Sequence, residues 1–440
     1  MTSLQRLFHH PQLKTRRSAF RLLWASSTVS SLGTAITAVA LPLTAVITLH
    51  ATAFEVGLLS AAGTVAWLLF GIVSGVWVDR LRRRPLLVAC DLARAIALLS
   101  VPLAAAARDL TMGQLLMVAF TVGTGSVFFD VAFQSHVPTV VDDGDLLSAN
   151  TWLQGGIETT RLAGPGLGGV LVQLLGAPVT LLADVASYLA SALCLLSLGN
   201  TEERSEIPVQ RSGQVKEARE GFSYLWSNPT LRSLALSAAS LNVCESAILA
   251  VQVVFLVQTL HVRPGLVGVL IASDGAGAVL GAVAAGRIIG KLGNERTIAL
   301  AVTVGPVVSL LIPATANGPR LLLFAMGSAG LAAFTVVFSV TARVYRQTAV
   351  PRNLLGRVTA VNRFISWGVL PLGALLGGAL AQVIGTRAAL WLIAGLLITM
   401  TPVPVLLRPV RHKPDAPGRT PAKSTGPADE ANDYEPVEHG

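Results

Sequence analysis

The feature that most constrains this chain is a series of apolar stretches, each long enough to cross a lipid bilayer. A helix of about 20 apolar residues spans a hydrocarbon core of about 30 Å. Only 13% of the 440 residues are charged, whereas a soluble domain carries about a quarter. Twelve stretches are predicted, at 20–49, 54–78, 85–107, 112–137, 147–175, 178–198, 231–259, 266–289, 297–315, 320–345, 358–382 and 386–407. The sequence therefore predicts an all-α membrane protein.

The basic residues indicate how the chain lies in the membrane. If both termini are cytoplasmic, most of the 33 Lys and Arg residues fall in inner segments, as the positive-inside rule requires. The predicted outer loops hold four, namely Arg108, Arg263, Arg320 and Arg387. This distribution favours a bilayer over nucleic acid as the partner of a chain with net charge +9. We expect a multi-pass protein of a bacterial inner (plasma) membrane, without a removable signal peptide.

The two halves of the sequence resemble each other. Gly57 and Gly75 recur as Gly268 and Gly286 at the same spacing, which indicates duplication of a six-helix unit. In transporters built from such repeats, the substrate path lies between the two halves. Four regions are predicted: a six-helix half (1–199), a cytoplasmic linker with a short amphipathic helix (200–230), a second six-helix half (231–408) and a disordered cytoplasmic tail (409–440).

A charged motif follows the second apolar stretch and runs from Gly75 to Pro85. Gly75 allows two helices to approach closely, and Asp79 can bind the positive N-terminus of a helix in the other half. Arg80, Arg83 and Arg84 suit the cytoplasmic headgroup zone. The alternative interpretation is a basic stop segment that contains an Asp by chance.

This string resembles the G-x-x-x-D-R-x-G-R-[RK] motif of the major facilitator superfamily (MFS), with Arg82 in place of the second Gly. Further strings, such as 128–130, 347–351 and 371–373, extend the resemblance over 18–408. They look like a bacterial branch of enterobactin-exporter-like and macrolide/tetracycline efflux-like proteins. The resemblance implies the MFS fold, with twelve transmembrane helices in two pseudo-symmetric six-helix halves. Many members of that branch carry an Asp where this chain has Thr34.

A Gly-rich string in the fifth stretch is similar to the G-P-x-x-G-G antiporter motif of drug/proton exchangers. Gly164, Pro165, Gly168 and Gly169 match it. Proline removes a backbone hydrogen bond and small residues let helices touch, so the motif predicts a bent, tightly sealed contact. Ordinary glycine packing is the alternative, because Gly is frequent in membrane helices.

Ionisable residues within the stretches are the candidate proton and substrate sites. A charge in hydrocarbon is costly and needs a partner, water or a proton. Glu158 and Arg161 lie three residues apart near the predicted midplane, and Glu245 and Asp274 are candidates in the second half. Each could instead serve a structural role.

Three other acids in the stretches have separate interpretations. Asp91 is read as a structural ion pair with Arg94, and Asp184 as a hydrogen-bonded side chain. Asp130 and Arg343 occupy equivalent positions of the repeat, at the same predicted depth. They are a candidate cytoplasmic gate pair that closes when the outer side opens. The alternative is that Asp130 binds an arginine of its own half.

No enzyme pattern emerges. Cys90, Cys194 and Cys244 lack metal-ligand spacing, and the phosphate-loop lookalike at 286–291 lacks the Ser or Thr after its Lys. We therefore predict a monomeric secondary transporter without metal or cofactor. Its expected function is proton-coupled efflux of small amphipathic molecules of the drug, antibiotic or siderophore class. The alternatives are another cargo or direction, such as uptake or lysolipid movement, and a non-transporting membrane protein.

The motif that follows the second stretch generates a first prediction. A carboxylate at a helix N-terminus contributes up to about 2 kcal/mol of stabilisation. If Asp79 stabilises contact between the halves in this way, Asp79→Asn should slow transport by up to about 30-fold. Membrane insertion should be unchanged, because the substitution preserves shape. The measurement is efflux by cells with equal membrane levels of the variant and the unmodified protein. Equal efflux would contradict the assigned role of Asp79.

Overall fold

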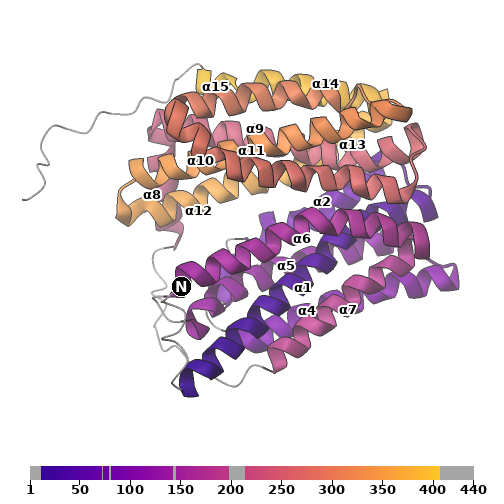
Figure 1. Ribbon diagram of the computed structural model, residues 1–440, viewed down its shortest axis with the longest axis horizontal. Coiled ribbons are helices and arrows are strands. Elements are labelled where there is room, and N and C mark those ends of the chain that lie inside the picture. The colour runs from indigo at the N-terminus through magenta and orange to yellow at the C-terminus, as the bar shows by residue number, and fades with distance from the viewer. Residues whose placement is uncertain (1–10, 72, 79–80, 142–144, 198–213, 407–440) are drawn as a thin grey trace, which may run out of the picture.

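A computed structural model describes residues 11–71, 73–78, 81–141, 145–197 and 214–406. Within these ranges the ordered elements are all helices, and they form two groups (Figure 1). The N-terminal half contains α1 (Pro11–Thr48), α2 (Ala53–Phe70), α3 (Val73–Val78), α4 (Arg83–Ala107), α5 (Met112–Val140), α6 (Leu146–Leu175) and α7 (Ala177–Leu196).

The second group begins after the linker. It contains α9 (Pro229–Val254), η2 (Phe255–Thr259), α10 (Pro264–Val308), η3 (Ser309–Leu311), η4 (Gly318–Arg320), α11 (Leu321–Ala349), α12 (Arg352–Gly368), α13 (Leu370–Ile384), α14 (Thr386–Met400) and α15 (Val403–Leu406). Between the halves lies α8 (Gln214–Ser227), in the segment for which an amphipathic helix was predicted. The predicted tail after 408 lies outside the described residues.

Twelve crossings are present in the described ranges, although ten helices pass a test of length and apolarity. One of the ten, Pro264–Leu311, holds two crossings. Gly293 separates them with φ 74° and ψ 168°, a backbone conformation that glycine adopts without a steric penalty. The remaining crossing is α6, whose Glu158 and Arg161 make it more polar than its neighbours. The predicted fold class is thus confirmed.

The internal repeat is visible in the backbone. Gly176 separates α6 from α7 with φ 86° and ψ 154°, and Gly385 separates α13 from α14 with φ 85° and ψ 152°. Both positions require the positive φ that glycine tolerates best. The two halves therefore turn the chain in the same way at equivalent places.

The two halves meet through glycines at one end of the bundle. A Cβ atom on Gly169 of α6 would lie 2.6 Å from Gly268 Cα of α10. A Cβ atom on Gly57 of α2 would lie 2.9 Å from Gly378 Cα of α13. We call this end the far end, and the end where α1 begins and α8 lies the α8 end. The halves converge at the far end and diverge toward the α8 end (Figure 1).

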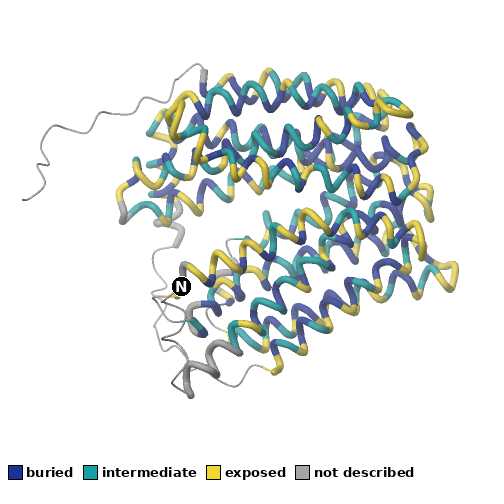
Figure 2. Tube along the Cα trace, viewed as in Figure 1, coloured by how far each residue is buried: buried dark blue, intermediate teal, exposed yellow. Residues whose placement is uncertain are grey.

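Burial follows the same division. Buried residues fill the interior of each half, and intermediate or exposed residues line stretches of the faces that the halves turn to each other near the α8 end (Figure 2). Asp130 on α5 and Arg343 on α11 are both exposed there. The arrangement leaves polar side chains accessible between the halves.

The glycine contact at the far end generates a second prediction. A larger side chain at Gly268 must displace the backbone of α6, and overpacking of this kind costs about 1–3 kcal/mol. Gly268→Val should therefore disfavour closure of the far end by about 5- to 150-fold and reduce transport. The matched control is Gly286→Val on the same helix, because nothing lies within 4 Å of a Cβ at that position. Equal transport by both variants, at equal membrane levels, would contradict the prediction.

Candidate functional site

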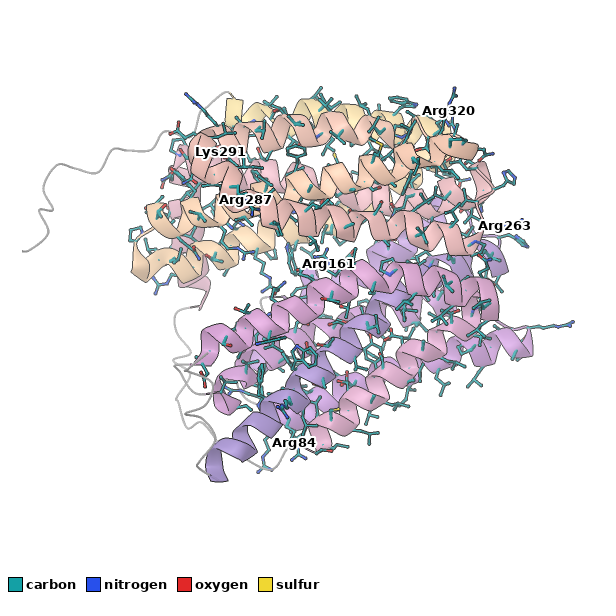
Figure 3. The ribbon with its side chains drawn as sticks, viewed as in Figure 1. Arg84, Arg161, Arg263, Arg287, Lys291 and Arg320 are labelled. Atoms are coloured by element: carbon teal, nitrogen blue, oxygen red, sulfur yellow. The ribbon has the colours of Figure 1, made fainter. Side chains whose placement is uncertain are left out.

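Arg161 of α6 faces two carboxylates of the opposite half. A Cβ atom on Gly275 of α10 would lie 2.8 Å from Leu162 Cα, so the two backbones touch beside Arg161. The charge of Arg161 acts on both Asp274 of α10 and Glu245 of α9. Figure 3 shows Arg161 at the boundary between the two groups of helices. These three charges form the centre of the candidate site.

Glu245 is fixed by a hydrogen bond within its own half. The Thr335 hydroxyl of α11 donates to Glu245 Oε1 over 2.5 Å. Hydrogen bonds to a charged acceptor are stronger than neutral ones, so Thr335 orients the carboxylate. Asp274 and Arg161 keep exposed surface. The group thus combines one held carboxylate with two accessible charges.

Glu158 makes a hydrogen bond within its own helix. Glu158 Oε1 accepts a hydrogen bond from Gln154 Nε2 over 2.7 Å, and both residues belong to α6. Among the described ion pairs it is not joined to Arg161. Its side chain is half-buried. The role of Glu158 in proton transfer stays a prediction.

The antiporter-like motif packs against both halves. A Cβ atom on Gly164 would overlap Ala35 of α1, and one on Gly168 would lie 3.1 Å from the Ile36 carbonyl oxygen. On its other side, the motif contacts α10 through Gly169 and through the carbonyl of Pro165. These glycines let α6 lie between α1 and α10, and the contact with α10 holds Arg161 near the opposite half.

Aromatic rings and an arginine join the halves closer to the α8 end. Trp67 of α2 and Trp367 of α12 make an edge contact with ring centroids 4.8 Å apart. The guanidinium of Arg363 lies 5.0 Å from the Trp67 ring and 4.4 Å from the Trp367 ring. Cation–π contacts of this kind contribute about 0.5–2 kcal/mol. Sequence reasoning missed these residues, although Arg363 was readable as a charge inside an apolar stretch.

Asp130 and Arg343 are not joined in the described ion pairs. The charges that act on Asp130 are those of Arg94 in its own half and Arg363 in the other. Arg343 acts on its neighbour Arg346. The two halves diverge toward the α8 end (Figure 1), and the gate stays a prediction.

The loop motif is described in part. Asp79 and Arg80 lie outside the described residues, and Gly75 lies in α3. Arg83 begins α4. Arg84 donates from Nε to the Leu195 carbonyl over 2.8 Å and from Nη2 to the Leu196 carbonyl. A cation at the C-terminus of a helix is stabilising, so Arg84 also caps α7 within its own half.

The comparisons with known proteins agree with this architecture. The model of the family described as "Transmembrane secretion effector" (MFS_3) matches residues 13–420. The chain belongs to this family of MFS transporters. It is therefore a multi-pass membrane transporter and not an enzyme, as predicted. In the part of the chain that the structure describes, no group of three His, Cys, Asp or Glu side chains could hold a metal.

Relatives and solved structures of this MFS_3 chain are distant but cover most of its length. It is 25% identical to the multidrug efflux pump Tap of Mycolicibacterium fortuitum, over 90% of this chain and 98% of that one. It is 20% identical to macrolide efflux protein A of Streptococcus pyogenes, over 89% and 96%. The crystal structure of the nucleoside transporter NupG superposes with a TM-score of 0.74 at 11% identity, over 88% and 98%. The last likeness shows the fold alone.

The charges shared between the halves generate a third prediction. Residues in one network show interaction free energies of about 0.5–3 kcal/mol in double-mutant cycles. We expect Arg161→Ala and Glu245→Ala to be non-additive in the melting temperature of the purified protein. The control cycle pairs Arg161→Ala with Asp109→Ala, an exposed residue of the loop after α4, and should be additive. Additivity in both cycles would show that Arg161 and Glu245 do not interact.

Proposed function

We propose that this MFS_3 transporter exports small amphipathic molecules in exchange for protons. The observation that carries the proposal is the group formed by Arg161, Glu245 and Asp274 across the two halves. Transporters of this architecture bind substrate and coupling ions near the midplane, between the repeats. The names of Tap and macrolide efflux protein A, both efflux pumps, support the direction.

The charges favour a cationic cargo. Two carboxylates face one guanidinium, so the group has one negative charge in excess when both acids are ionised. An uncompensated charge inside a membrane protein is costly. Either a proton or the positive charge of a substrate removes the excess. The two ligands therefore compete for the same site, which is the physical basis of exchange.

The surroundings suit an amphipathic molecule. Trp67 and Trp367 lie at the same interface, toward the α8 end, and Arg363 covers one face of each ring, which leaves the opposite faces to a cargo. Aromatic faces bind both apolar surface and cations. A cargo with a positive group and an apolar body would satisfy the carboxylates and the rings together.

The orientation follows from the charge distribution. Arg84, Arg287 and Lys291 lie toward the α8 end, whereas Arg263 and Arg320 lie at the far end (Figure 3). By the positive-inside rule we assign the α8 end, and both termini, to the cytoplasm. In this conformation the site is open to the cytoplasm. Substrate would enter there, displace a proton and leave at the far end after the halves rock.

A fourth prediction tests the function. In an efflux-deficient bacterial host, the protein should raise resistance to cationic amphipathic compounds in a susceptibility panel, and a proton uncoupler should abolish their efflux. Glu245→Gln and Asp274→Asn remove the competing charges, so each should abolish proton-dependent efflux. Asp109→Asn is the control for loss of an acid outside the site.

Other outcomes would redirect the proposal. Accumulation of a labelled compound would reverse the direction of transport. Efflux that persists with the uncoupler would exclude proton coupling. Full efflux by both site variants would move the coupling step away from Glu245 and Asp274.

A further inference from the structure

A second set of charges lies wholly inside the N-terminal half. Asp91 and Arg94 of α4 form an ion pair in which Asp91 is fully buried and Arg94 is 3% exposed. The guanidinium lies between the rings of Phe129, at 4.5 Å, and Tyr188, at 4.2 Å. Asp184 of α7 is also fully buried, and its charge acts on Arg94. Two buried carboxylates thus share one buried guanidinium.

Small residues make room for this cluster. A Cβ atom on Gly125 of α5 would lie 2.7 Å from Arg94 Cγ. One on Gly33 of α1 would overlap Asp184 Oδ1 and the Ser187 hydroxyl. Two helices are therefore shaped around charged side chains, although an apolar core would cost less.

The hydrogen bonds of the cluster are incomplete. Asp91 Oδ2 and Arg94 Nε are buried and have no hydrogen-bond partner among the described residues. Most buried polar atoms in proteins have one, and each exception calls for a reason. Asp91 binds Arg94 through its other oxygen, Oδ1. Arg94 also donates from Nη1 to the Ser126 hydroxyl over 3.4 Å, so Nε is the guanidinium nitrogen without a partner in the described residues.

The charge count requires a proton. With both acids ionised, Asp91, Asp184 and Arg94 have one negative charge in excess, and all three side chains are buried in this conformation. One bound proton makes the cluster neutral, which removes the cost of an uncompensated buried charge. The cluster is therefore neutral with one proton and charged without it.

Asp184 is the acid that takes this proton. Asp91 is paired directly with Arg94, which favours its ionised form. Asp184 binds neutral hydroxyls instead: Thr37 donates to Oδ2 over 2.6 Å and Ser187 to Oδ1 over 2.8 Å. A hydroxyl can both donate and accept. When Asp184 Oδ2 gains a proton from water, Thr37 can accept the new hydrogen bond.

The cluster is connected to the interface between the halves. The charge of Arg94 interacts electrostatically with Asp130 of α5, and so does the charge of Arg363 of α12. From the far end, helical rise places Asp184 about 10 Å deep on α7, Arg94 about 20 Å on α4 and Asp130 about 27 Å on α5. These charges form a series that crosses most of the membrane.

We propose that the cluster is a proton-binding site in which Asp184 holds the proton and Arg94 transmits its presence to Asp130. When Asp184 is ionised, both buried acids hold Arg94, and Asp130 is free to pair with Arg363 and draw the cytoplasmic side closed. When Asp184 is protonated, Arg94 is shared with Asp130, and the cytoplasmic side opens. A proton taken from outside thus favours the inward-open state. Export by exchange requires this direction of coupling, because the proton must return the empty transporter to the cytoplasmic side.

The inference rests on the proposed proton coupling, but it places a proton outside the substrate path. Other ionisable groups that face the cluster are Cys90 on α4 and Tyr188 on α7. From α1 the facing groups are hydroxyls, since Thr34 bonds the Tyr188 hydroxyl at 3.0 Å and Thr37 bonds Asp184. The carboxylates are therefore the groups that exchange a proton in the cluster.

Infrared difference spectroscopy of the purified protein tests the site without a substrate. The carbonyl band of a buried, protonated carboxyl should be present at neutral pH in Glu245→Gln, in which Asp274 alone balances Arg161, and every further variant is made in that background. Asp184→Asn and Asp91→Asn should each lose the band, because either variant leaves one carboxylate to balance Arg94. Asp130→Asn should keep the band. Its retention in Asp184→Asn, or in Asp91→Asn, would overturn the proposal.

Thiol labelling tests the connection to the gate. Gln134 is exposed one turn beyond Asp130 on α5, and its Cys variant is made with Cys194→Ala because the other two cysteines are buried. Measured relative to a free thiol in the same buffer, which corrects for thiolate formation, labelling should slow as pH rises, and Asp184→Asn should remove that dependence. In alkaline buffer we expect the variant to react about fivefold faster or more, for a coupling of about 1 kcal/mol. Identical pH profiles would overturn the connection.

The two proposals fail in different ways. If efflux is insensitive to uncouplers while the band behaves as expected, the proposed function fails and the proton site stands. If efflux is proton-driven while Asp184→Asn keeps both the band and the pH profile, the site is wrong and the function stands.

Discussion

The arrangement of this transporter depends on close contact between the backbones of its two halves. Gly169 meets Gly268, and Gly57 meets Gly378, at distances that leave no space for side chains. In lipid, helices associate through packing and hydrogen bonds rather than through the hydrophobic effect, so such contacts hold the halves together at the far end. They also place α6 against α10 and set Arg161 opposite Asp274 and Glu245. The site is therefore a product of the interface, and no single half contains it.

The membrane makes each ionised side chain costly, and this chain meets the cost in two ways. Between the halves, Arg161 and Asp274 keep exposed surface, so water, a proton or a cargo can compensate the excess charge. Inside the N-terminal half, Asp91, Arg94 and Asp184 are buried and depend on one another, on two aromatic rings and on hydroxyl groups. The group between the halves suits a ligand that binds and is released in each transport cycle. The buried cluster suits a proton that stays bound until the conformation changes.

Asp130 lies where these two arrangements meet. It is exposed between the halves, yet a buried arginine of its own half acts on it together with Arg363 of the other half. Arg363 is in turn stacked on Trp67 and Trp367, which belong to different halves. A change of partner at Asp130 would therefore alter a contact that joins the halves, which makes it a physical means of linking protonation to rocking. Arg343, the equivalent of Asp130 in the repeat, interacts instead with the charge of Arg346 in its own helix.

The sequence by itself determined the twelve crossings, the duplication and the family, because hydrophobic length, charge asymmetry and glycine spacing are local properties that one sequence displays. It also indicated Arg161, Glu245 and Asp274 individually, as charges inside apolar stretches. Only the tertiary structure decided which of them meet. Glu158, three residues from Arg161, binds Gln154 instead, and the charge of Asp184 acts on Arg94, 90 residues earlier in the chain. Partnership between helices depends on their packing and rotation, which are set by contacts distant in sequence, and spacing along one helix does not contain that information.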